Sequence, residues 1–272
     1  MGAWKYMSSV INFYDKYDED KRLIKDNARK IEFHVTTTIL NKYILPKHKI
    51  LELGAGTGAY SFYYAERGNM VVATDLTPKH VDIIKEKIKA KGEKVNVSAD
   101  IINATDLSVY DSESFDIVTC LGPMYHLTDE KDRVKCIQES LRVLKPGGIL
   151  AIAYINKHYI IHGVMANQRE FFTPIFVDKI LSKGFNKDGE EECFFTVGFF
   201  TSPTEIETFM NKFNVSIIDH AATDGISALL REHINELNDE GYNAWMNYSI
   251  GSCREKSILG ISNHGLLICE KK

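Results

Sequence analysis

The sequence lacks three features that would each place it in a different class of protein. No window approaches the roughly 20 apolar residues of a membrane span, and residues 1–10 lack the basic-then-apolar order of a signal peptide. The five cysteines are an odd number, are widely scattered and form no CxxC pair, so neither a disulfide framework nor a zinc knuckle is indicated. No lysine- and arginine-rich run stands out, and the net charge is −4, which indicates no clear nucleic-acid surface. These absences predict a soluble, cytoplasmic protein that does not bind a membrane.

The sequence does contain a repeating α/β pattern. Short apolar segments alternate with amphipathic helical segments at the spacing of strand–helix units. The predicted strands are residues 50–53, 70–74, 95–99, 115–121 and 149–155. With 272 residues, 44% of them hydrophobic, the chain can bury a large core. The predicted fold class is α/β with a mostly parallel sheet.

A glycine-rich turn follows the first predicted strand. The segment Leu51–Gly58 reads LELGAGTG and precedes a predicted helix. Glycine permits a tight turn and lets a ligand approach the backbone closely, and the helix N-terminus offers free N–H groups. A plain strand-to-helix connection is the alternative, but three alternate glycines have little use in packing. We therefore expect a ligand at this turn.

An acidic residue ends the second predicted strand. Asp75 lies 21 residues after Gly54, a spacing at which a carboxylate accepts hydrogen bonds from ribose hydroxyl groups. The alternative is a helix-capping or solvated aspartate. Together, the turn and Asp75 predict a cofactor with a nucleoside part at the carboxyl edge of the sheet, without specifying which cofactor.

These segments resemble the class I S-adenosylmethionine-dependent methyltransferases. Glu52, two positions before the first glycine, and the GxGxG spacing are similar to the first motif of that family. Further similar segments are Asn103-Ala104, Phe115–Val118 and Arg142–Gly148. The resemblance implies a Rossmann-like α/β fold, with a mostly parallel seven-stranded sheet, helices on both faces and an antiparallel last strand.

The resemblance also implies the cofactor S-adenosylmethionine, its product S-adenosylhomocysteine, and the residues that contact them. Those for the methionine end are Glu52, Gly54, Ala55, Gly56 and Gly58; for ribose and adenine Asp75, Leu76, Asn103 and Ala104; and for the sulfonium Cys120, Leu121 and Gly122. The family often has an aspartate at the adenine position, so Asp100 or Asp106 is the alternative to Asn103.

A second motif follows the fourth predicted strand, where cofactor and acceptor meet in such sheets. The segment Leu121–Leu127 reads LGPMYHL and resembles a GPLYHL segment in a group of bacterial methyltransferases thought to act on small molecules. His126 and Tyr125 are the candidate catalytic residues. His126 either removes a proton from the acceptor or has only a structural role. Tyr125 is expected to shape the pocket rather than to donate a proton.

Four parts are expected along the chain. Residues 1–45 form an N-terminal helical arm or lid, 46–156 the cofactor-binding core, 157–202 a cap insertion on the substrate side, and 203–272 the rest of the core, with a helical insertion near 226–250. Tyr14 and Tyr17 in the arm either fold over the cofactor or pack between helices. The cap is rich in phenylalanines that either line an acceptor pocket or form its own core. They are Phe171, Phe172, Phe176, Phe194, Phe195, Phe199 and Phe200.

The sequence thus predicts an enzyme that transfers a methyl group from S-adenosylmethionine to a small molecule by in-line displacement. The alternatives are an RNA or protein methyltransferase, and a regulatory module that binds S-adenosylmethionine without catalysis. A nicotinamide dehydrogenase shares the turn and the acid, but Glu52 and the GxGxG spacing argue against it. No metal is expected, because His158 and His162 lack a third ligand at metal spacing. The acceptor's identity and the oligomeric state are not predicted.

Overall fold

The computed structural model describes residues 2–187, 190, 193–194 and 197–272, with side chains described from residue 9 onward. The strands are β1 (Lys49–Leu53), β2 (Met70–Asp75), β3 (Val97–Ile101), β4 (Phe115–Cys120), β5 (Leu144–Asn156), β6 (Phe185–Asn186), β7 (Gly198–Thr201), β8 (Val215–Ala222) and β9 (His264–Lys271). The α-helices are α1 (Gly2–Lys16), α2 (Asn27–Leu40), α3 (Ala59–Ala65), α4 (Pro78–Lys91), α5 (Glu130–Val143), α6 (Lys157–Asn167), α7 (Pro174–Lys183), α8 (Pro203–Met210), α9 (Arg231–Asn235), α10 (Asp239–Ser252) and α11 (Lys256–Ile261). Four short 3-10 helices are Glu19–Lys21, Gly92–Lys94, Pro123–Tyr125 and Arg169–Phe171.

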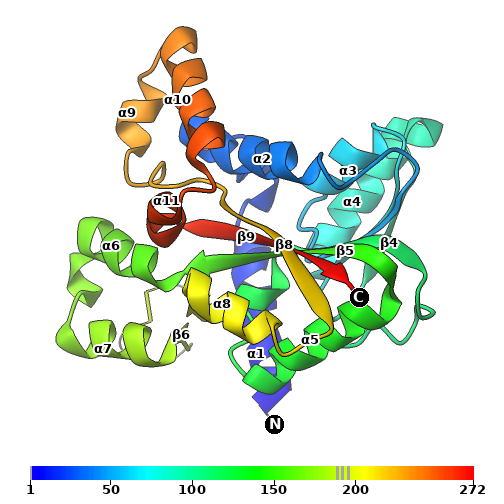
Figure 1. Ribbon diagram of the computed structural model, residues 1–272, viewed down its shortest axis with the longest axis horizontal. Coiled ribbons are helices and arrows are strands. Elements are labelled where there is room, and N and C mark those ends of the chain that lie inside the picture. Colours follow the sequence, from blue (N-terminus) through cyan, green and yellow to red (C-terminus); the bar gives the residue numbers. More distant parts are fainter. Residues whose placement is uncertain (1, 188–189, 191–192, 195–196) are drawn as a thin grey trace.

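One twisted sheet organises the molecule, in the order β3-β2-β1-β4-β5-β9-β8 (Figure 1). Strands β1 to β5 pair in parallel, and β9 is antiparallel to both β5 and β8. This is the predicted seven-stranded Rossmann-like arrangement, and the prediction of the fold is confirmed. The small strands β6 and β7 extend the sheet beside the end of β5.

Two hydrophobic layers cover the sheet because alternate strand residues point to opposite faces. Ile50 and Ile117 pack with the apolar faces of α2, α3 and α4, whereas Leu51 and Val118 pack with those of α5 and α8. A third cluster fills the segment after β5, where Phe176 contacts Phe194. Phe171, Phe176, Phe194 and Phe200 belong to this cluster or pack against it, whereas Phe172 is exposed. None of the described cap phenylalanines lines the cavity at the glycine turn, and Phe195 lies outside the described residues.

Two predicted strand boundaries are wrong. The third strand covers Val97–Ile101 rather than 95–99. The fifth begins at Leu144 rather than at Ile149, because Leu144 already pairs with Phe115 before a register shift in β4. Such a shift marks a bulge, which a pattern of apolar residues does not reveal.

The N-terminal arm is two helices joined by a polar connection. The connection holds the 3-10 helix Glu19–Lys21, and α2 begins after Asp26, whose side chain accepts a hydrogen bond from the backbone N–H of Arg29. This N-cap fixes where α2 starts. The connection lies over the carboxyl ends of the strands, near the glycine turn. No helix in the described part of the chain is long and apolar enough to cross a membrane.

Candidate functional site

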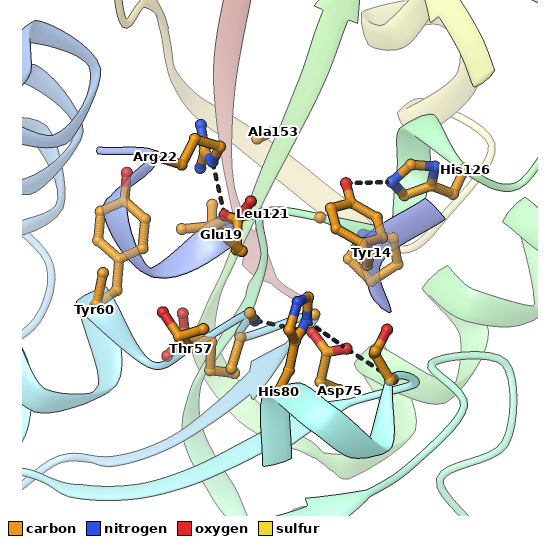
Figure 2. A pocket seen from close by; sticks show the side chains of 18 of the residues that line it. Tyr14, Glu19, Arg22, Thr57, Tyr60, Asp75, His80, Leu121, His126 and Ala153 are labelled. Atoms are coloured by element: carbon orange, nitrogen blue, oxygen red, sulfur yellow. Dashed lines mark hydrogen bonds and ion pairs between the residues drawn. The ribbon is translucent and has the colours of Figure 1, made fainter. Parts of the chain in front are cut away.

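A cavity of about 150 Å³ lies at the carboxyl ends of the central strands (Figure 2). Strand β1 lies between β2 and β4, and its last residue, Leu53, pairs with Thr74 near the end of β2 and with Cys120 at the end of β4. The loops that follow them therefore meet at one edge. Predicted site residues that line the cavity are Tyr14, Glu52, Gly54, Ala55, Gly56, Asp75, Leu76, Asn103, Ala104, Leu121, Gly122, Tyr125 and His126. Gly58, Cys120 and Tyr17 do not line it.

The glycine turn has the backbone geometry that its sequence predicts. Gly54, Gly56 and Gly58 have φ values of +70°, +55° and +86°, in the left-handed region that favours glycine. A Cβ on Gly54 would lie 2.8 Å from Cδ of Pro123, so the turn also packs tightly on the loop after β4. Gly58 instead lies against the side chain of Phe62 on α3. The first two glycines thus shape the cavity, and the third allows close packing of α3.

Asp75 organises the edge of the cavity through both carboxylate oxygens. Oδ2 accepts a hydrogen bond from the backbone N–H of Gly56 at 2.8 Å, and Oδ1 accepts one from the N–H of Thr77 at 2.8 Å. His80 Nδ1 lies 3.2 Å from Oδ1, and Nε2 of the same ring is buried without a hydrogen-bond partner among the described residues. Asp75 therefore links the glycine turn to the start of α4.

Glu52 is a buried acid beneath the turn. The Ser61 hydroxyl donates a short hydrogen bond to its Oε2. Burial raises the pKa of Glu52 to about 7, a net value to which the hydrogen bond from Ser61 contributes a lowering and the negative charge of Asp75 a further raising. A nearby cationic ligand would stabilise the ionised form of this acid.

Asn103 and Ala104 line the cavity, whereas Asp100 and Asp106 do not. The side-chain oxygen of Asn103 accepts hydrogen bonds from the backbone N–H and the hydroxyl of Thr105, both at 3.0 Å. Asn103 thus holds the shape of the loop after β3. Of the three polar residues considered for adenine, the geometry favours this one.

His126 is engaged through both ring nitrogens. Nδ1 lies 3.1 Å from the carbonyl oxygen of Val197 and donates to it, since a carbonyl can only accept. Nε2 is then free to accept from the Tyr14 hydroxyl at 2.9 Å. Burial lowers the pKa of His126, so the neutral ring is favoured. His126 therefore ties the arm to the cap, whereas Tyr17 stacks on Phe13 outside the cavity.

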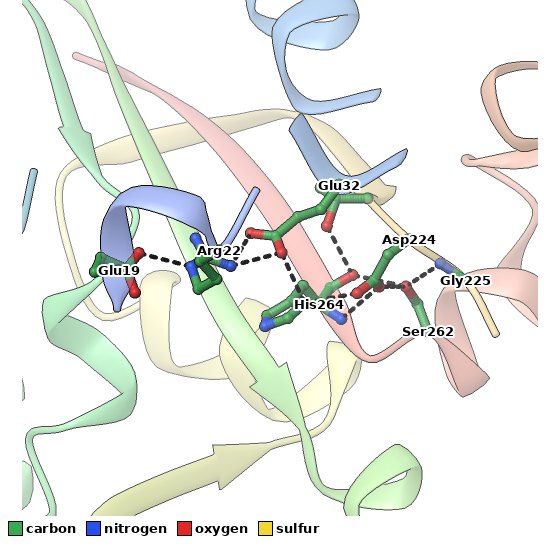
Figure 3. Close-up of polar contacts among 8 residues, drawn as sticks. Glu19, Arg22, Glu32, Asp224, Gly225, Ser262 and His264 are labelled. Atoms are coloured by element: carbon green, nitrogen blue, oxygen red, sulfur yellow. Dashed lines mark hydrogen bonds and ion pairs between the residues drawn. The ribbon is translucent and has the colours of Figure 1, made fainter. Parts of the chain in front are cut away.

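Sequence reasoning missed a buried ion-pair chain at the base of the arm (Figure 3). Nε of Arg22 lies 2.7 Å from Glu19 Oε1, and one terminal nitrogen of Arg22 reaches both carboxylate oxygens of Glu32, at 3.1 and 2.8 Å. The other oxygen of Glu19, Oε2, is buried without a hydrogen-bond partner among the described residues. These residues occur in a run of mixed charges that is typical of a solvated helix face, so no sequence pattern indicates the ion pairs.

A second missed group joins the arm to the last strand. Nδ1 of His264, at the start of β9, lies 2.7 Å from Asp224 Oδ2, and Asp224 Oδ1 accepts from the His264 backbone N–H and from the Ser262 hydroxyl. Burial by itself would lower the pKa of His264, but the carboxylates of Asp224 and Glu32 outweigh burial and raise it. Donor atoms of Glu32, Asp224 and His264 lie within 4.8 Å of one another, and these residue types bind metals. Arg22 already pairs with Glu32, and its positive charge opposes a cation there.

Comparison with known proteins identifies the core. Residues 50–148 match a family model described as a methyltransferase domain. Residues 50–148 of this chain are therefore a methyltransferase domain. Erythromycin 3''-O-methyltransferase of Saccharopolyspora erythraea is 36% identical over 109 residues, which are 39% of this chain and 34% of that protein. The tRNA 5-carboxymethoxyuridine methyltransferase of Escherichia coli is 26% identical over 126 residues, which are 46% of this chain and 47% of that protein.

The fold of the domain agrees with solved structures. A magnesium protoporphyrin IX methyltransferase from Synechocystis, solved with bound S-adenosylhomocysteine, superposes with a TM-score of 0.60 at 13% identity, covering 98% of this chain and all of that one. This likeness at 13% identity shows the fold alone. The family model and the curated relatives confirm the predicted methyltransferase family, whose cofactor is S-adenosylmethionine. The first curated relatives match over 34% to 60% of their own length, so the sequence match is to their methyltransferase domain and not to their whole chains.

Proposed function

We propose that the protein is an S-adenosylmethionine-dependent methyltransferase whose acceptor is a small molecule. The observation that carries the proposal is the cavity itself, in which a left-handed glycine turn and Asp75 meet at the carboxyl edge of the sheet. When bound, the cofactor supplies a methyl group on a sulfonium, which is already activated for transfer. The chain then has to align two reactants and exclude water.

The charges of the cavity fit this cofactor. Five carboxyl groups line the cavity together with the guanidinium of Arg22, and Oε2 of Glu19 lacks a hydrogen-bond partner among the described residues. The five acids are Glu19, Asp20, Glu32, Glu52 and Asp75. S-adenosylmethionine carries positive charge on its sulfonium and its amino group, whereas a nicotinamide dinucleotide would bring a pyrophosphate against these carboxylates. Glu52 and the turn would hold the methionine end, Asp75 and Leu76 the ribose, and Asn103 and Ala104 the adenine.

The arm supports a small acceptor. Glu19 contacts the position above Gly56, the Tyr14 hydroxyl reaches His126, and Lys79 donates to the Asp15 carbonyl at 2.6 Å. Through these contacts the N-terminal arm covers the cavity (Figure 2). A covered cavity favours a small molecule over an RNA or protein chain, although the relatives include a tRNA methyltransferase. A closed site beside the donor methyl also favours catalysis over a purely regulatory role.

Calorimetric titration with S-adenosylhomocysteine tests the cofactor site. We expect saturable binding to the wild type, no binding of NADH, and more than tenfold weaker binding to Asp75→Ala, equivalent to about 1.4 kcal/mol. Asp75→Asn keeps the shape of the side chain, and its affinity should lie between those of the wild type and Asp75→Ala. Binding of NADH in place of S-adenosylhomocysteine would overturn the proposal, as would equal affinity of the Ala variant and the wild type.

His126 is proposed to position the arm rather than to take a proton, because both its nitrogens are engaged. His126→Gln should raise KM for S-adenosylmethionine several-fold while kcat keeps the pH profile of the wild type. A catalytic base would behave differently: its loss would lower kcat and remove one limb of that profile. Tyr14→Phe, which deletes only the hydroxyl, should also raise KM for S-adenosylmethionine.

A further inference from the structure

A second cavity lies behind His264. It has a volume of about 130 Å³ and shares Arg22, Glu32 and His264 with the cavity at the glycine turn. Its remaining polar wall is formed by Arg29, Arg231 and Asn263. The three shared side chains separate the two cavities and are called the partition below (Figure 3).

Positive and negative side chains around the second cavity are unequal in number. Each carboxylate already has partners: Glu32 is held by Arg22, and Asp224 by His264 and Ser262. Three arginines thus face two carboxylates around the second cavity, a net positive charge before any proton on His264 is counted. A divalent cation would meet repulsion here, and an anion would meet attraction.

Arg29 and Arg231 have unused hydrogen-bonding capacity. The Nε atom of each is buried and lacks a hydrogen-bond partner, and neither guanidinium forms an ion pair among the residues that the structure describes. Leaving a buried donor of a charged group unsatisfied is energetically unfavourable. Guanidinium groups match carboxylates and phosphates through paired N–H donors, so an oxyanion between the two would satisfy both.

We propose that the second cavity binds an anionic group of the methyl acceptor, a carboxylate or a phosphate held by Arg29 and Arg231. Arg29 lies on α2 and Arg231 begins α9, so the arm and the segment after β8 are brought together at this group. The rest of the acceptor would then reach the first cavity beside His264, which lines both cavities, once the partition side chains make room for it. This inference rests on the proposed methyl transfer and narrows its substrate class to acids.

The test uses the full-length protein and probes of known charge. Benzoate, phenyl phosphate and inorganic phosphate are titrated calorimetrically, with benzamide as the neutral counterpart of benzoate, in the presence and in the absence of S-adenosylhomocysteine. The variants are Arg29→Met and Arg231→Met. Arg67→Met is the matched control, because Arg67 is exposed at the end of α3 and lines neither cavity.

We expect at least one anion to bind with a stoichiometry of one and at least tenfold more tightly than benzamide. Either cavity variant should weaken this binding more than tenfold, and Arg67→Met should leave it unchanged. The preferred probe distinguishes a carboxylate from a phosphate. Anions that bind no better than benzamide, or equally well to all four proteins, would overturn the inference.

Titration with S-adenosylhomocysteine separates this inference from the proposed function. Normal binding of that ligand without arginine-dependent anion binding would leave the methyltransferase proposal intact and reject the acidic acceptor. Arginine-dependent anion binding without any binding of S-adenosylhomocysteine would show an anion site that serves no methyl transfer, and both proposals would then fail. Saturable binding of Mg²⁺ or Zn²⁺ to the wild type that Glu32→Gln abolishes would instead assign the partition to a cation.

Discussion

Replacing Gly54 by alanine should weaken S-adenosylhomocysteine binding by about 100-fold, equivalent to about 2.8 kcal/mol. Gly54 has a φ of +70°, which costs an alanine about 1–2 kcal/mol. The new methyl group would also lie 2.8 Å from Cδ of Pro123 and 3.3 Å from Cα of Gly122. A proline ring and a backbone atom cannot move aside as a flexible side chain would. The turn and the loop after β4 must therefore separate, and both line the cavity.

Gly68→Ala is the matched control for this prediction. Gly68 has a φ of +90°, but a Cβ there meets nothing within 4 Å, so this variant has the backbone strain without the clash. Its melting temperature should fall while its affinity for S-adenosylhomocysteine stays the same. Calorimetry and thermal unfolding on both variants measure the difference. If Gly68→Ala lost as much affinity as Gly54→Ala, general destabilisation would explain both results.

The features of the candidate site that could be predicted from the sequence are those in which one local segment dictates one backbone geometry. The turn after β1 needs left-handed backbone at alternate positions, and only glycine adopts this conformation without strain. The sequence GAGTG therefore predicts the turn. The mostly parallel sheet followed from the alternation of strands and helices, and its antiparallel last strand from the family resemblance. Asp75 was found because its place after β2 follows from the spacing.

The parts that were missed depend on contacts between distant segments. Arg22 and Glu32 are ten residues apart and meet only because α2 folds back beside the polar connection that precedes it. Asp224 and His264 are separated by 40 residues and meet because β8 and β9 pair at their ends. The motif left His126 as either a base or a structural residue, and the partners that bear on this choice, Tyr14 and Val197, lie far away in the sequence. Such pairings come from tertiary structure, which periodicity and spacing do not encode.

Replacing Arg22 by methionine should lower the free energy of unfolding by about 3 kcal/mol at pH 8, because breaking one side of a buried pair leaves uncompensated charge. Glu32 and Glu19 would both lose their guanidinium partner, and their side chains are only 18% and 14% exposed. The double variant Arg22→Met/Glu32→Gln should recover part of this loss, since it removes one of the stranded charges. Urea denaturation at several pH values measures each difference.

The pH dependence of this loss identifies its cause. Burial raises the pKa of Glu32, but Arg22 and His264 outweigh burial and hold it below its usual value in the wild type. The ionised carboxylate therefore stabilises the wild type above its unfolded-state pKa, and this contribution fades as the pH falls through the folded-state pKa. Without Arg22, burial should raise the folded-state pKa above the unfolded value, so the cost of ionising Glu32 grows as the pH rises. The difference in the free energy of unfolding between the wild type and Arg22→Met should consequently narrow from pH 8 toward pH 4. A gap that stays constant over this range would mean that Arg22 stabilises the arm through the packing of its aliphatic stem, and not through the charges that close the partition between the two cavities.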